Sequence, residues 1–397
     1  MKIFKGNFNV TRLPANNRLH HIDALRAIAA LCVVIMHFYT GLPGGAASSA
    51  LAGNVQVLDF GRIGVVLFFT ISGFVIPGSL QPGEHKGVFW IRRFFRLYPA
   101  YWVSICAVIL AQWLFLDTTF SLRQILANIT MLQNFMHFEN IQGVYWTLEV
   151  ELIFYVMVYL AFCCHLLEKP AFLLAASAFF FVIFVFYLDY WTGVTTLAHR
   201  FIEFANLSHV SDAHGGTADN HPLPGALNMN WGNFSGYFSV MYLGAALRLW
   251  FIGKMNRADK FATGILALGW FVLLPAMGMI VYVRTQDVGL FSMYGSWSTA
   301  LALFMILAFL SPIRSKIMVW LGVVSYSLYL LHPLVIDTLF AFHATAAWAA
   351  AYPLLALLFC IIISAALAGC LYHTVERTAV NIARQLTKGL STRNGNL

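Results

Sequence analysis

Charged residues are scarce in this chain of 397 residues. Only 10% of the residues are Asp, Glu, Lys or Arg, whereas 60% are hydrophobic, and the mean hydropathy is +0.74. Soluble domains are usually about a quarter charged, so this composition argues against a chain of two or three such domains. Apolar runs of about twenty residues recur along the whole length, which is what an α-helix needs to cross a bilayer. The sequence therefore predicts an all-α, polytopic membrane protein.

The signals of several common enzyme classes are missing as well. The chain has no Walker-type phosphate loop, no HExxH and no GxSxG, so ATP-driven transport and zinc or serine hydrolysis have little support. The six cysteines show no metal-ligand spacing and are expected to be free, buried thiols. The histidines between His199 and His221 have no specific spacing either, and solvated loop residues are the better interpretation. We therefore expect no metal site, and no removable signal peptide before the first apolar run.

Ten apolar segments are predicted to span the membrane. They begin near residues 23, 61, 98, 144, 171, 236, 261, 289, 317 and 350. The expected organisation is a cytoplasmic N-terminal segment (1–20), one membrane domain (21–375) and a short cytoplasmic tail (376–397). No internal repeat or low-complexity tract suggests a second domain.

The distribution of basic residues tests this topology. The net charge is +8, which could indicate nucleic acid, but the charges lie in short segments between apolar runs. With the N-terminus inside, nineteen of the twenty-four basic residues fall on the cytoplasmic side. The remaining five are Arg26, Arg62, Arg123, Arg200 and Arg284. This asymmetry predicts both termini in the cytoplasm, with the lipid bilayer as partner and no nucleic acid.

The first apolar segment carries ionisable residues along one face. Eleven helical steps separate Arg26 from His37, so the two lie within about 20° of each other around the axis. Asp23 falls on the same face. Such groups are costly at membrane depth and usually face a protein interior or a wet cavity. Asp23 and Arg26 form either an ion pair at the membrane edge or part of a site for an anion that enters from inside.

His37 is the candidate general base. It is expected about 7 Å below the outer end of its helix, and Glu151 about 10 Å below the same surface. A carboxylate at matching depth would fix the imidazole tautomer, and Tyr155 shares the face of Glu151. The alternative is a histidine bonded to a neighbouring helix for packing. Glu149 lies about 200° from Glu151 around the helix axis, so only one of the two can line the cavity. Glu151 is slightly favoured because it lies deeper in the membrane.

Arg93 and Arg96 lie one turn apart on an expected short cytoplasmic helix. Paired guanidinium groups bind phosphates well, but the ordinary positive-inside signal, or attraction to anionic lipid, also accounts for them. Helix packing is the simpler explanation of Ser325 and Tyr326, which precede His332 in the segment VSYSLYLLHP.

A set of motifs in fixed order resembles the acyltransferase-3 family of integral membrane acyltransferases. It begins with the stretch from Asp23 through Arg26 to His37. The motifs that follow are GVVLFFTISGF (64–74), IRRFFRLYPAYW (91–102), YWTLEVELIFY (145–155), SYSLYLLHP (325–333) and VERTA (375–379). Each motif is weak by itself, but the ordered set is specific. Two positions depart from the family: Val66, where many members carry aspartate, and Ala24, where glycine is common.

The resemblance implies ten membrane helices and transfer of an acyl group, most often acetyl from acetyl-CoA, to a hydroxyl of a glycan or other envelope compound. It implies that His37 is catalytic with Arg26 as its paired arginine, and that Arg93 and Arg96 bind the acyl donor. We expect Arg26 to contact the acyl-CoA as well. Glu151 matches the glutamate of the WxLxxE motif. Asp23, Glu149, Tyr155 and Ser325 are then supporting residues.

The expected function is thus an O-acyltransferase in the cytoplasmic (inner) membrane of a bacterium, with acetyl-CoA as donor and an envelope glycan or glycoside as acceptor. A covalent acyl-histidine intermediate stays open. The alternatives are a polytopic transporter or flippase whose intramembrane charges line a substrate path, and a catalytically silent sensor or assembly partner. A transporter needs neither the arginine pair nor the WTLEVE motif.

Overall fold

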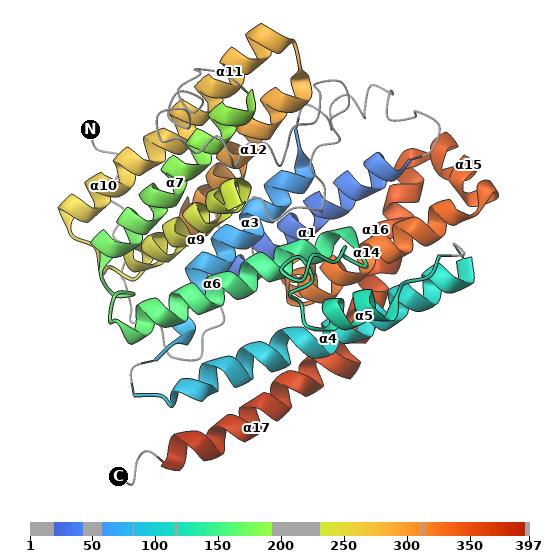
Figure 1. The fold of residues 1–397 in the computed structure, drawn as a ribbon, viewed down its shortest axis with the longest axis horizontal. Coiled ribbons are helices and arrows are strands. Elements are labelled where there is room, and N and C mark those ends of the chain that lie inside the picture. The colour runs from blue at the N-terminus through green and yellow to red at the C-terminus, as the bar shows by residue number, and fades with distance from the viewer. Residues whose placement is uncertain are drawn as a thin grey trace.

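The computed structural model describes residues 20–42, 58–81, 83–115, 118–192, 231–310, 313 and 315–393. Over these ranges the chain forms helices and short connections without a strand, which confirms the all-α prediction. The long helices run side by side in one bundle (Figure 1). The expected cytoplasmic segment 1–20, apart from His20, and the loop histidines between His199 and His221 lie outside the described residues.

The helices follow one another with short connections. The first half of the chain contains α1 (His20–Gly41), α3 (Phe60–Val75), η2 (Pro77–Ser79), α4 (Lys86–Phe115), α5 (Leu122–Ile129), η3 (Gly143–Tyr145), α6 (Trp146–Cys163) and α7 (Pro170–Thr192). The second half contains α9 (Trp231–Phe251), α10 (Arg257–Leu268), η6 (Gly269–Leu273), α11 (Leu274–Thr285), α12 (Val288–Met305), η7 (Ile306–Leu310), α13 (Lys316–Val323), α14 (Ser325–Ala341), α15 (His343–Ala351), α16 (Pro353–Leu371), η8 (Tyr372–Glu376) and α17 (Arg377–Arg393).

Within the described ranges, eight helices are long and apolar enough to cross a membrane, and nine if the bent pair α13 and α14 is one span. The chain is therefore a multi-pass membrane protein, but the predicted count of ten is not confirmed. The difference is the segment expected at 236–251. It forms α9, which has 21 residues but is not apolar enough to be counted. Its described side chains are almost all buried between α3 and α7, so protein rather than lipid surrounds it.

The sequence predicts a separate short helix for the basic segment 86–96, and the structure does not contain one. The segment is the first part of α4, one helix of 30 residues that contains Pro99 in its interior. Arg93 and Arg96 are therefore rigidly connected to a membrane span. The tail helix α17 packs against α4, as Figure 1 also shows.

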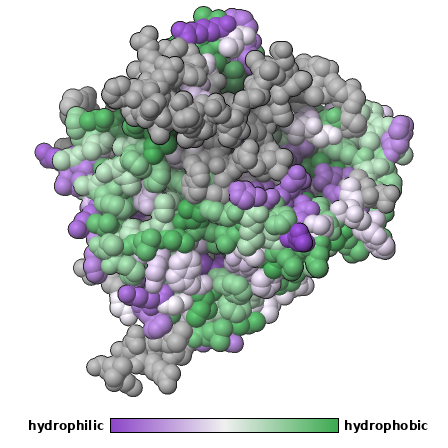
Figure 2. All heavy atoms as spheres, viewed as in Figure 1, coloured by the Kyte–Doolittle hydropathy of each residue, from purple (hydrophilic) through white to green (hydrophobic). Residues whose placement is uncertain are grey.

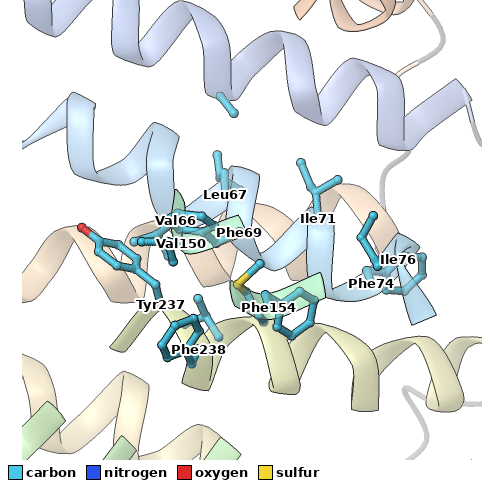
Figure 3. Packing of buried hydrophobic residues seen from close by; sticks show 14 of the residues in the cluster. Val66, Leu67, Phe69, Ile71, Phe74, Ile76, Val150, Phe154, Tyr237 and Phe238 are labelled. Atoms are coloured by element: carbon cyan, nitrogen blue, oxygen red, sulfur yellow. The ribbon is translucent and has the colours of Figure 1, made fainter. Parts of the chain in front are cut away.

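The core forms around α3. Val66 and Phe69 of α3 meet Val150 and Phe154 of α6 and Tyr237 of α9 in one buried cluster (Figure 3). α3 and α9 approach each other closely because α3 has a glycine where the two helices cross. A Cβ on Gly73 would lie 1.9 Å from the backbone oxygen of Met241 in α9.

The outer surface is apolar over a wide area, as a lipid-facing surface requires. Figure 2 shows hydrophobic side chains across much of the face seen there. Large side chains such as Phe261, Val283 and Leu354 are more than half exposed. All six cysteines are free thiols, as expected, but only Cys32 and Cys360 are buried.

Candidate functional site

Three arginines from two helices face one cavity. Arg26 of α1 and Arg93 and Arg96 of α4 line a space of about 110 Å³. The other polar residues that line it are Ser72 of α3, Thr147, Glu151 and Tyr155 of α6, and Ser325, Tyr326 and Tyr329 of α14. The structure therefore brings together six of the predicted site residues: Arg26, Arg93, Arg96, Glu151, Tyr155 and Ser325. His37, Asp23 and Glu149 are not in its lining.

Arg93 is held by aromatic rings rather than by a carboxylate. Its guanidinium carbon lies 5.6 Å from the ring centre of Phe89 and 5.5 Å from that of Tyr155. Its Nε is buried and has no hydrogen-bond partner, and within the described parts of the chain no ion pair neutralises it. Cation–π contacts stabilise the charge without neutralising it, and the Tyr155 hydroxyl is close enough to accept a hydrogen bond from the guanidinium. Arg93 is therefore available to an anion in the cavity.

Arg96 has a fixed partner. Its guanidinium forms an ion pair with Glu376, whose side chain is completely buried in η8. Ser327 of α14 donates a second hydrogen bond to Glu376, at 2.9 Å. Arg96 still lines the cavity, with 31% of its side chain exposed. The two arginines are thus not equivalent: Arg96 joins α4 to the C-terminal part of the chain, and Arg93 does not.

Arg26 and Asp23 form the ion pair that was one of the two possibilities, with 3.2 Å between Nη1 and Oδ1. The Asp23 side chain is buried, whereas that of Arg26 is 27% exposed and faces the cavity. The pair therefore orients Arg26 without removing it from the site.

Glu151 does not pair with His37, so this part of the prediction is wrong. Its Oε1 accepts hydrogen bonds from Ser72 Oγ at 3.0 Å and from Tyr155 Oη at 2.7 Å. The expected depth match did not specify which helices are neighbours. Because α6 packs on α3 and α9, Glu151 points into the arginine cavity instead.

Glu149 has a structural place outside this cavity. Its buried carboxylate accepts hydrogen bonds from the side chain of Asn134 and from the backbone N–H of Phe135. It thereby fixes the connection between α5 and α6. The slight preference for Glu151 as the cavity residue agrees with this geometry.

His37 contacts a second histidine. Its Nδ1 lies 2.9 Å from the carbonyl oxygen of Val33 and 3.4 Å from Nε2 of His332 in α14. The two ring centres are 5.0 Å apart. His332 lies in the segment VSYSLYLLHP, and its sequence position alone indicated no role for it. Ser325, Tyr329 and His332 have the helical spacing i, i+4, i+7, which could have placed them on one face of α14.

Tyr329 connects the cavity with the histidine pair. Its ring lines the cavity and lies 5.8 Å, centre to centre, from that of His332. Its hydroxyl is hydrogen-bonded to Thr147 of α6 at 2.9 Å. Along α14 the order is therefore cavity, Tyr329, His332, with His37 beyond. Ser325, at the start of this face, donates to the Gly322 carbonyl, which is a structural bond at the bend between α13 and α14.

No group of three or more His, Cys, Asp or Glu side chains suitable for a metal ion occurs in the part of the chain that the structure describes. What the site offers is a cationic cavity in the membrane domain, a carboxylate in that cavity, and a pair of imidazoles beyond Tyr329. Anion binding and proton transfer are the chemistry that these groups can perform.

Comparison with known proteins gives a consistent result. A sequence model of a family described as "Acyltransferase domain" matches residues 19–374. No solved structure matches the chain. The chain is 24% identical over 328 residues to a "Putative acetyltransferase ORF330" of Acidianus two-tailed virus, covering 80% of this chain and 83% of that protein.

Two further relatives match over shorter stretches. "Nodulation protein 10" of Rhizobium leguminosarum bv. viciae is 31% identical over 160 residues, which are 34% of this chain and 42% of that protein. "Peptidoglycan O-acetyltransferase OatA" of Listeria monocytogenes is 35% identical over 95 residues, which are 22% of this chain and 13% of that protein. The chain thus spans less than half of both of these relatives. Since the family match covers nearly the whole helical bundle, the chain belongs to the acyltransferase-3 family and is a multi-pass membrane protein.

Proposed function

We propose that the protein is an O-acetyltransferase that moves an acetyl group from acetyl-CoA to a hydroxyl of an envelope glycan or glycoside. The observation that supports this best is the meeting of Arg26, Arg93 and Arg96 in one cavity. Guanidinium groups bind phosphates through paired charge-assisted hydrogen bonds, and CoA carries several phosphates. Relatives that carry acetyltransferase names support acetyl as the transferred group.

The donor site in this proposal is the arginine cavity. Arg93 makes the main phosphate contact, because among the described residues it is the arginine of the three that forms no ion pair with a carboxylate. Arg96 and Arg26 contribute positive electrostatic potential and hydrogen bonds to the phosphates while they keep their ion pairs with Glu376 and Asp23. Glu151, held by Ser72 and Tyr155, positions Tyr155 under Arg93. The acyl arm then extends along α14 past Tyr329 to His37.

The chemical step follows from the imidazole of His37. Nε2 takes the proton of the acceptor hydroxyl, and the oxygen attacks the thioester carbonyl carbon. The carbon–sulfur bond then breaks, an ester is formed, and the CoA thiolate takes the proton back from the imidazolium. No other reactant is consumed. His37 lies near the end of α1 that we predict to be outside. The acceptor therefore enters from the outer side of the bacterial inner membrane, opposite the cytoplasmic acetyl-CoA.

The experiment compares three single variants in nanodiscs, with radiolabelled acetyl-CoA and an envelope extract as acceptor. Arg93→Ala should weaken CoA binding by about tenfold or more, which corresponds to the loss of a charged hydrogen bond. His37→Gln should keep CoA binding and lose transfer by about a hundredfold or more. Arg92→Ala is the matched control, since Arg92 is on the same helix but pairs with Glu84 outside the cavity lining.

The outcomes separate the donor site from the chemistry. If His37→Gln transfers label as well as the wild-type protein, the proposed reaction is wrong. If Arg93→Ala and Arg92→Ala bind CoA equally, the cavity is not the donor site. If the protein moves a glycan across the vesicle membrane but never labels it with acetyl, it is a transporter instead.

A further inference from the structure

The contacts of His37 and His332 define the protonation of both rings. Nδ1 of His37 lies 2.9 Å from the carbonyl oxygen of Val33, and Nδ1 of His332 lies 3.2 Å from that of Leu328. A carbonyl oxygen can only accept a hydrogen bond, so each Nδ1 carries the proton. The Nε2 of neutral His332 then carries a lone pair and no proton. It lies 3.4 Å from the Nδ1 atom of His37, which carries a proton. In this arrangement the free lone pair of His37 is on its Nε2.

We propose that His332 is a positioning residue for His37. This inference rests on the proposed function, in which His37 is the general base. His332 shares the Nδ1–H of His37 with the carbonyl oxygen of Val33. The two acceptors together keep Nε2 as the basic nitrogen, and both continue to accept that N–H when the imidazolium forms. The proton taken from the acceptor hydroxyl resides on Nε2 of His37 until the CoA thiolate removes it. His332 itself gains and loses no proton.

This role is the one that we expected of Glu151. In many hydrolases a carboxylate orients the base and stabilises its charged form. Here the position next to Nδ1 is occupied by a neutral imidazole. A neutral acceptor binds an imidazolium less strongly than a carboxylate does, but it avoids the cost of a buried negative charge in a membrane domain. The exchange of a carboxylate for a histidine thus fits the surroundings of the site.

Packing alone does not explain His332. Its side chain is completely buried, and a buried polar group is costly unless it is hydrogen-bonded. An apolar residue would fill the same space without that cost. Among the described residues, Asp59 at the start of α3 is a further ionisable group close enough to affect His37, and Asp59 accepts hydrogen bonds from the backbone and side chain of Arg62. Among the described residues, His332 is therefore the side-chain acceptor that contacts the ring, beside the backbone carbonyl of Val33.

The test uses two substitutions that differ in one property. His332→Phe keeps a planar ring of similar size but removes the acceptor. His332→Gln places an amide oxygen near the position of Nε2 and restores an acceptor. We expect His332→Phe to lower kcat by about 10- to 100-fold, as for the loss of a partner that orients a metal-binding histidine, with an unchanged KM for acetyl-CoA. We expect His332→Gln to recover most of that loss. The matched control is His373→Phe, which changes an exposed histidine outside the cavity lining and should leave kcat unchanged.

A spectroscopic measurement makes the test independent of turnover. ¹⁵N-histidine labelling, with His37→Gln to assign the signals, should show Nε2 of His37 unprotonated in the wild-type protein. In His332→Phe the signals should shift towards a mixture of tautomers. A wild-type His37 protonated on Nε2, or a folded His332→Phe variant with kcat within twofold of wild type, would overturn the proposal. If His37→Gln itself retains transfer, the proposed function fails instead.

Discussion

At the scale of single residues, the ion pair of Arg96 and Glu376 has a consequence for stability. Glu376 is completely buried, and Arg96 balances its charge. Removing one partner of a buried pair leaves an uncompensated charge and typically costs about 3–5 kcal/mol. We therefore expect Arg96→Ala to lower the thermal unfolding temperature markedly. Glu376→Gln should cost less, because an amide oxygen can still accept the bond from Ser327.

Arg92→Ala provides the comparison for this prediction. Arg92 forms its ion pair with Glu84 while 40% of its side chain is exposed, and such pairs contribute about 0–1 kcal/mol. The unfolding temperature of the Arg92→Ala variant should stay close to that of the wild-type protein. Equal unfolding temperatures for Arg96→Ala and Arg92→Ala would mean that the Glu376 pair does not stabilise the fold.

The sequence predicted which residues line the cavity better than it predicted their partners. Arg26 could be selected because a charge is costly at membrane depth. Arg93 and Arg96 could be selected from their one-turn spacing together with the family resemblance. Their partners come from distant parts of the chain: Glu376 is 280 positions after Arg96, and His332 is 295 after His37. Helical periodicity determines depth and face within one helix, but not the neighbouring helix. This is why Glu151 could be matched to His37 in depth and yet bond to Ser72 and Tyr155.

At the scale of elements, the contact between α13 and α1 sets the position of Arg26. A Cβ on Gly322 would lie only 1.7 Å from the backbone oxygen of Asp23. We expect Gly322→Ala to force the two helices apart and to move the Asp23–Arg26 pair away from the cavity. CoA binding should weaken and the unfolding temperature should fall. Both are measured on the protein in nanodiscs.

Gly295→Ala in α12 is the matched control, since nothing lies within 4 Å of its Cβ. Alanine favours a helix over glycine by about 1 kcal/mol, so this variant should be as stable as the wild type or slightly more so. If Gly322→Ala binds CoA like Gly295→Ala, the position of Arg26 does not depend on this crossing.

Element boundaries could be predicted where hydropathy changes sharply, and less well where it does not. The basic segment before residue 98 appeared to be a separate helix because its charges interrupt the apolar pattern. In the structure it is continuous with α4, since lysine and arginine are good helix formers. The bend of 77° between α13 and α14 has no proline at the break, and no signal used in the sequence analysis indicated it.

At the scale of the whole molecule, the helix count depends on α9. An ion pair of 2.8 Å joins Lys254, which follows α9, to Glu168, which precedes α7. The two helices pack along each other, so α9 runs antiparallel to α7 over the same depth. If α7 crosses the membrane, α9 crosses it as well. If the bent pair α13 and α14 is also one span, we expect ten crossings with both chain ends on one side, as the basic residues predict.

Cysteine labelling in intact cells tests this topology. In a chain without its six native cysteines, single cysteines replace Glu168, Lys254, Gln286 and Gln385. A membrane-impermeant maleimide should label position 286, between α11 and α12, from outside. Positions 168, 254 and 385 should react only after the membrane is opened, because α9 returns the chain to the side on which α7 began. Labelling of position 254 from outside, with 168 still protected, would show that α9 does not cross, and an odd number of crossings would then place the chain ends on opposite sides.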